Sequence, residues 1–168
     1  MKRVLTFKSS FNQHSKVIIK NFENIGDYKM KCMIGSKEMI EILTRFLKEG
    51  EHLSYPIECN IAKIGKETMK SEAFIGLTEN DLLVSISFFD IQKQYKIARF
   101  QLNEIENVKV KKSLILKHYT VTITFEEKNK RNDIIIKMPE KVIGDFKQQS
   151  ENIRGVLDTI GKYSKELK

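Results

Sequence analysis

The hydrophobic period changes at Gly50, and this change constrains the fold more than any other feature of the 168-residue chain. Before it, apolar residues recur at helical spacing and form one face. They are Met39, Ile40, Leu43, Phe46 and Leu47. After it, apolar and polar residues alternate over residues 53–61, which is the period of a half-buried strand. The sequence therefore predicts a helix over 36–49, capped by Ser36 and ended by Gly50, followed by a strand.

Short apolar runs separated by turn-forming residues continue to residue 138. We predict seven strands, at 53–61, 73–78, 82–89, 95–102, 105–111, 119–126 and 133–138. Short connections between them favour an antiparallel meander over parallel β-α-β units. Pro56 favours an edge position or a bulge in the first strand, because it cannot donate to a ladder. Residues 63–70 are expected to form a loop. A change of apolar phase in the fourth strand predicts a bulge near Ala98 and Arg99.

The chain closes with a second apolar stripe of helical spacing. Its members are Val142, Phe146, Ile153, Leu157 and Ile160. They predict a helix over 139–162, with Pro139 at its first position. Gly144 and Gly155 weaken that helix by about 1 kcal/mol each, so packing must hold it. The expected fold class is mainly β (α+β): a seven-stranded, partly open antiparallel barrel, capped by the C-terminal helix and preceded by an extra N-terminal helix.

The net charge of +8 is unevenly distributed. Residues 1–31 hold seven cations and two acids, a net charge of +5, which leaves +3 for the rest of the chain. We therefore divide the chain into a basic extension, 1–35, and a domain, 36–168. The extension forms either short strands, at 4–7 and 16–22, or a partly ordered arm. Only five of the 30 cations are arginine, so specific nucleic-acid recognition is not expected.

Catalytic signatures are missing from the sequence. His14, His52 and His118 lack metal-ligand spacing, so no metal site is expected. Neither a serine nucleophile elbow nor a phosphate-binding glycine loop occurs. The carboxylates of Glu104 and Glu106 are interpreted as solvated positions beside a strand. The chain is expected to have no enzymatic activity and no cofactor.

Two cysteines are too few for a disulfide framework. Cys32 and Cys59 are interpreted as free thiols in a reducing cytoplasm, with Cys59 buried because it alternates with isoleucines. Neither a signal peptide nor a run of about 20 apolar residues is found, so a cytoplasmic location is expected.

Three segments carry a family resemblance. They are Leu47–Glu51, Phe74–Val84 and Phe100–Val108. They are similar to the opening, the second hairpin and the later strand link of bacterial pleckstrin-homology-like (PH-like) domains. The resemblance spans roughly residues 48–162. It implies a PH-like fold and a binding or scaffolding role, with a protein partner or a second copy of the chain as the expected partner.

The resemblance also implies a candidate anion site. In the phosphoinositide-binding members of this superfold, basic residues at the end of the first strand and the start of the second cradle the headgroup. The matching residues here are Lys63, Lys66 and Lys70. Glu67 interrupts the segment, and a solvated lysine loop is the favoured alternative, because lysine is mostly exposed.

A second basic cluster surrounds three adjacent apolar residues. It comprises Lys109, Lys111, Lys112, Leu114, Ile115, Leu116 and Lys117. No acid occurs in residues 107–125. As a loop, this segment would enter an anionic membrane interface or dock on a protein partner. The alternative, favoured by general burial preference, is that the apolar residues belong to a strand or pack under the sheet. Binding to an anionic membrane ranks second to protein binding, and an enzyme with an unrecognised site ranks third.

Overall fold

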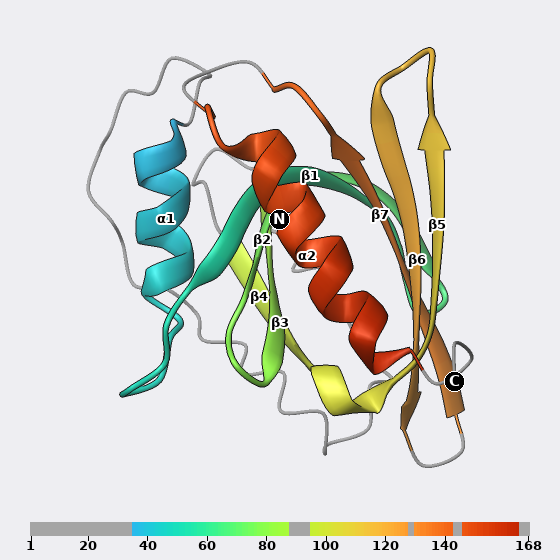
Figure 1. Ribbon diagram of the computed structural model, residues 1–168. Helices are drawn as coiled ribbons and strands as arrows, with labels where there is room; N and C mark the ends of the chain where they lie inside the picture. The colour runs from blue at the N-terminus through green and yellow to red at the C-terminus, as the bar shows by residue number, and fades with distance from the viewer. Residues whose placement is uncertain (1–34, 88–94, 128–129, 143–145, 165–168) are drawn as a thin grey trace, which may run out of the picture.

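The computed structural model describes residues 35–87, 95–127, 130–142 and 146–164 (Figure 1). Its elements are α1 (Ser36–Thr44), β1 (Ser54–Ile64), β2 (Glu67–Leu77), β3 (Asp81–Ser87), β4 (Tyr95–Gln101), the short 3-10 helix η1 (Leu102–Glu104), β5 (Ile105–Ser113), β6 (His118–Glu127), β7 (Lys130–Pro139) and α2 (Gln149–Tyr163). All strand pairs are antiparallel, in one open sheet of order β4-β3-β2-β1-β7-β6-β5. The predicted fold class is confirmed. The predicted strands at 4–7 and 16–22, Cys32 and Gly144 lie outside the described residues.

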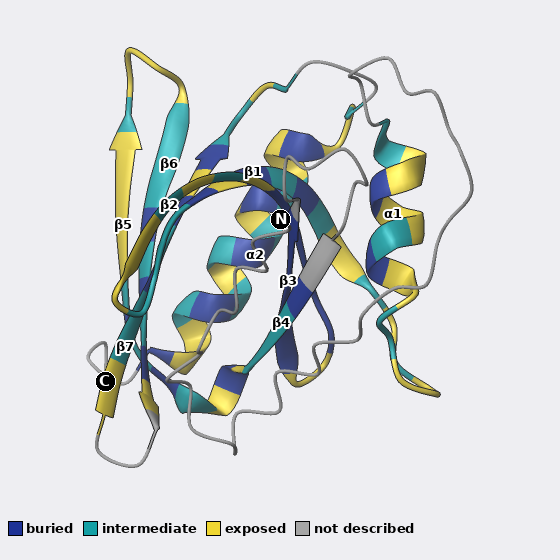
Figure 2. Ribbon diagram, turned by 180° about the vertical axis from the view of Figure 1, so that it is seen from behind, coloured by how far each residue is buried: buried dark blue, intermediate teal, exposed yellow. Residues whose placement is uncertain are grey.

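The sheet is covered on both faces. On the inner face, α2 packs Ile153, Val156 and Ile160 against the main core, which is built from inward-facing residues of the curved sheet. On the outer face, α1 packs Met39 and Leu43 on a smaller cluster that includes Phe74 of β2. Figure 2 shows continuous burial over residues 73–77 of β2 and 81–86 of β3, whereas the first half of β2 is mostly exposed. These parts of the two strands pass between two apolar layers, which explains why they are apolar at consecutive positions.

Helix α1 ends five residues before the predicted boundary. Gly35 is its N-cap rather than Ser36, and the helix stops at Thr44 instead of Glu49. The amides of Phe46 and Leu47 bond to carbonyls three residues back, which tightens the chain into a turn after Thr44. Gly50 lies in the following segment with φ of 81°, a left-handed conformation that suits glycine.

The C-terminal helix begins ten residues after the predicted start. Pro139 is not a helical residue, because it ends β7 and pairs with His118 of β6. The cross-strand partner, which lies 21 positions away in sequence, overrides the local preference of proline for a first helical position.

Strand β1 lies in the middle of the sheet, but β7 pairs with it only from Asn60 onward, so Pro56 has a neighbouring strand on one side only. The predicted bulge is confirmed: the register with β2 shifts between Ser54 and Ile57, and Tyr55 has φ of 50°. The predicted loop over 63–70 is wrong. Strand β1 continues to Ile64 and β2 begins at Glu67, so only a two-residue turn separates them.

The predicted bulge near Ala98 and Arg99 is absent, because β4 pairs with β3 without a register shift. Ala98 and Phe100 pack against the inner core, whereas Ile97 is buried on the opposite face of the same strand. The change of apolar phase therefore reflects burial on both faces and not an extra residue.

Candidate functional site: the tip of the β5–β6 hairpin

The turn between β5 and β6, Leu114–Lys117, is called the tip here. It projects from the end of the sheet as a narrow hairpin (Figures 1 and 2). Leu114, Ile115 and Leu116 are 80%, 91% and 70% exposed. The alternative that these residues belong to a strand or pack under the sheet is therefore wrong. Three consecutive large apolar side chains in water are unusual, since single exposed apolar residues are the ordinary case.

Backbone contacts hold the tip in a defined conformation. The Ser113 hydroxyl accepts a hydrogen bond from the Leu116 amide at 3.2 Å. Lys117 has φ of 46°, and its carbonyl accepts a bond from the Glu140 amide at 2.9 Å. The tip is thus tied both to its own strand and to the segment that follows β7. Its apolar side chains are presented on a fixed turn, which lowers the entropic cost of binding.

Lysines without an ion-pair partner among the described residues lie behind the tip on the outer face of the sheet. Lys109 and Lys111 lie on one face of β5, with half-exposed Val110 on the other, and they pair with Thr122 and Thr120 of β6. Thr120 pairs in turn with Lys137 of β7, which brings a third exposed lysine into the same row. Sequence reasoning missed Lys137. Its alternation with Ile136 indicates that it lies on the outer face of the sheet. Only strand pairing places it in the same row as Lys111, with Thr120 between them.

Lys112 has a different environment from the other lysines of the cluster. Its ammonium binds a Glu140 carboxylate oxygen at 2.7 Å and the Tyr119 hydroxyl at 3.0 Å, and it lies 4.9 Å from the centre of the Tyr119 ring. The hydrogen bond that Lys112 donates to Glu140 is the main cause that raises the pKa of Lys112, and the same bond lowers the pKa of Glu140. Lys112 therefore joins the base of the tip to the end of β7, and its charge is matched.

The other predicted cluster lies at the opposite end of the sheet. Ile64, beside the β1–β2 turn, pairs with Ile134 near the start of β7, whereas Pro139 at the end of β7 lies beside the tip. Lys63 is within 3.9 Å of the Asp133 carboxylate. Lys66 is exposed in the turn, and Lys70 is exposed on β2. The two-residue turn provides no loop around a ligand. The structure thus separates the two predicted clusters instead of joining them.

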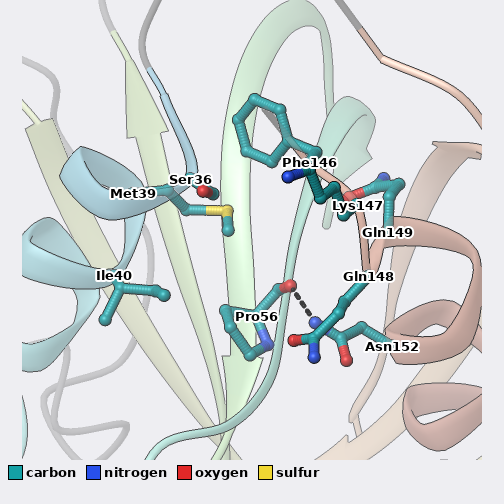
Figure 3. A pocket seen from close by; sticks show the side chains of 9 residues that line it. All are labelled: Ser36, Met39, Ile40, Pro56, Phe146, Lys147, Gln148, Gln149 and Asn152. Carbon is teal, nitrogen blue, oxygen red and sulfur yellow. Dashed lines mark hydrogen bonds between the residues drawn. The ribbon is translucent and has the colours of Figure 1, made fainter. Parts of the chain in front are cut away.

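A shallow hollow of about 260 Å³ lies between α1 and the start of α2 (Figure 3). Met39 and Phe146 face each other across it, and Pro56 forms part of its wall. The amide of Asn152 is occupied by a 2.9 Å hydrogen bond to the Pro56 carbonyl. Of the described residues that line the hollow, Lys147 alone is titratable. The hollow therefore does not bring together the titratable groups that general acid–base catalysis uses.

The remaining polar candidates have structural partners. Glu106 of β5 receives a 2.6 Å bond from Arg131 of β7, across the intervening β6. Cys59 is a free, fully buried thiol, as predicted, and burial raises its pKa. Within the described ranges, no three histidine, cysteine or acidic side chains gather at metal-binding distance. No helix in the part of the chain that the structure describes has the length and apolarity to cross a membrane.

Comparison with known proteins shows which solved structures have a similar fold. No protein family and no curated protein sequence matches the chain. Among solved structures, the hSac2 domain from the human phosphoinositide phosphatase Sac2 is similar, with a TM-score of 0.51 and 9% identity, over 78% of this chain and 84% of that one. That domain has a PH-like fold. The chain has a PH-like fold. At 9% identity the likeness carries no further argument, and the bacterial branch of the family stays a prediction.

Proposed function

We propose that this chain is a non-catalytic binding module of the bacterial PH-like family, located in the cytoplasm, that attaches to another surface through the tip. The exposure of Leu114, Ile115 and Leu116 is the observation that carries the proposal. Burying one such side chain contributes about 1.5–3 kcal/mol, so covering all three would provide substantial binding energy. The fixed turn that presents them supports the same role.

Strand addition to β5, one of the two edge strands of the sheet, is less well supported than binding at the tip. On β5 the outward-facing amide of Val108 already donates to the Ser164 hydroxyl at 3.3 Å. Beyond it, the same edge strand carries Lys109, Lys111 and Lys112. Lysines on an edge strand oppose pairing with a further strand. A second copy of the chain or a protein partner would therefore bind at the tip rather than along β5.

A fluorescent reporter at the tip tests the proposal. The chain contains no tryptophan, so Ile115→Trp introduces a single fluorophore of that type. The labelled chain is mixed separately with unlabelled wild-type chain, with the soluble protein fraction of its source cells, and with vesicles of their total lipid extract. We expect a blue shift of the emission with at least one of these, because the tip loses contact with water on binding.

The matched control places the reporter at the other end of the sheet. Lys66→Trp occupies the exposed β1–β2 turn. Its fluorescence emission should not shift under conditions that shift the emission of Ile115→Trp. Unchanged emission from Ile115→Trp with all three preparations, or an equal shift from Lys66→Trp, would overturn the proposed role of the tip.

A further inference from the structure

We infer that the surface bound by the tip is an anionic lipid bilayer, with Leu114–Leu116 in the membrane interface and Lys109, Lys111, Lys117 and Lys137 against the headgroups. This inference rests on the proposed function and names its partner. It depends on three properties of the hairpin: its shape, its charge and the depth at which its lysines stand.

The shape of the tip suits a bilayer better than a protein. A stable protein interface buries roughly 800 Å² on each partner, contributed by about 20–30 residues. The apolar surface at this end consists of the three tip residues, with Val110 half-exposed behind them. Lysine side chains surround it, and interface centres are depleted in lysine. A membrane interface accepts a narrow apolar projection without needing a complementary surface.

The charge around the tip is positive over a long segment. Residues 107–125 contain no acid. Lys112 is bound to the Glu140 carboxylate at 2.7 Å, and the charge of Lys117 also contributes to the lowered pKa of Glu140. Among the described residues, no carboxylate lies within salt-bridge distance of Lys109, Lys111, Lys117 or Lys137. The charge of these four lysines is therefore available to an external anion.

Lys111 and Lys117 stand at the depth that an interfacial position requires, and Lys109 lies two residues, or about 7 Å, farther from the bilayer. Lys111 precedes Leu114 by three residues, or about 10 Å at the rise of a strand. Interfacial elements bury their apolar side about 5–10 Å into the boundary between headgroups and acyl chains. With the tip at that depth, Lys111 lies level with the headgroups. Lys117 is nearer to the apolar residues and can extend its ammonium outward along its flexible stem.

Vesicle binding by the full-length chain tests this inference. Phosphatidylcholine vesicles, with and without phosphatidylglycerol, are sedimented with the wild-type chain and with variants. We expect binding only to the anionic vesicles, and less of it at high salt. Substituting Leu114, Ile115 and Leu116 together by serine should weaken binding on the order of a hundredfold or more. Free glycerol phosphate, at the same phosphate concentration, should not compete, because it offers no interface to the apolar residues.

Two triple variants of equal charge distinguish the tip from the β1–β2 hairpin. Lys109→Gln, Lys111→Gln and Lys117→Gln together should weaken binding by about fivefold per lysine, or on the order of a hundredfold. Lys63→Gln, Lys66→Gln and Lys70→Gln together should change it by less than tenfold. All these side chains are exposed or half-exposed, so unchanged thermal unfolding is expected and verifies folding.

The outcomes separate the two proposals. Equal binding to neutral and anionic vesicles, equal losses in the two lysine variants, or no binding to anionic vesicles would each overturn the bilayer inference. If Ile115→Trp then still shifts with wild-type chain or with soluble protein, the binding module stands and its partner is a protein. If Ile115→Trp shifts with nothing, both proposals fail.

Discussion

The side-chain amide of Gln149 in α2 pairs with the backbone of Glu58 in β1 as a neighbouring strand would. Its nitrogen donates to the Glu58 carbonyl at 2.7 Å, and its oxygen accepts from the Glu58 amide at 3.1 Å. Strand β7 pairs with β1 only from Asn60 onward, so this stretch of β1 lacks a strand on that side. The same nitrogen also donates to the Pro139 carbonyl at 3.1 Å. Gln149 thus completes the sheet where its two halves diverge.

Removing this amide should destabilise the protein strongly. Gln149→Leu leaves polar backbone groups of Glu58 and Pro139 without partners beneath a side chain that is 3% exposed. An unsatisfied buried group costs about 1–3 kcal/mol, so we expect a loss of roughly 3 kcal/mol in the free energy of unfolding, measured by urea denaturation. The adjacent, exposed Gln148→Ala should change it by less than about 0.5 kcal/mol. Similar losses for both variants would contradict the pairing role.

Two glycines of α2 should respond to alanine with opposite signs. A β-carbon on Gly155 would lie 2.3 Å from a ring carbon of Tyr55, whereas nothing lies within 4 Å of one on Gly161. Alanine is intrinsically favoured over glycine in a helix by about 1 kcal/mol. We therefore expect Gly161→Ala to raise the melting temperature and Gly155→Ala to lower it. Stabilisation by Gly155→Ala would mean that the Tyr55 ring does not pack against this helix.

The carboxylate of Glu51 should stabilise the fold in a pH-dependent way. It pairs with Arg99 through both oxygens, and Arg99 also contacts Asp81 at 3.1 Å. Burial raises the pKa of Glu51, but the bonds from Arg99 and from the Lys48 amide outweigh it, so the pKa lies below its ordinary 4.5. The ionised form therefore contributes stability above that value, and the contribution is lost as pH falls through the folded-state pKa.

Denaturation of Glu51→Gln at several pH values checks this. We expect a deficit of about 2 kcal/mol near pH 7 that shrinks as the pH falls below the ordinary pKa of 4.5 and vanishes once the carboxyl group is protonated in the folded state. Glu49→Gln, an exposed position two residues earlier, should show no such dependence. A deficit that persists in acid would instead assign the effect to packing.

The left-handed backbone at Lys117 predicts that glycine and alanine variants change their order of stability between two positions of one hairpin. Glycine adopts φ of 46° without the steric cost that a β-carbon brings. Lys117→Gly should therefore be more stable than Lys117→Ala by about 1 kcal/mol. At Lys109, within β5, glycine should instead be less stable than alanine by about 0.5–1 kcal/mol. The same order at both positions would indicate that the turn has another conformation.

The local pattern of the sequence determined that seven strands form and where β2 turns into β3, but it missed how far β1 and β2 extend toward their shared turn. At that turn the Thr78 hydroxyl accepts bonds from the amides of Asn80 and Asp81, which the short run of turn formers anticipates. Alternation also identified Cys59 as an inward-facing residue. These features depend on neighbours a few positions away, so they can be predicted from periodicity and side-chain type alone.

The tertiary structure decided everything that depends on a distant partner. Pro139 ends a strand because His118 pairs with it. Lys112 is ion-paired because Glu140, which follows that same strand, lies beside it. Lys137 joined the basic face through pairing with Thr120. The tip residues are exposed because no element in the part of the chain that the structure describes reaches them, although their apolarity indicates burial. Pairing and coverage join residues far apart in sequence, and no local period encodes them.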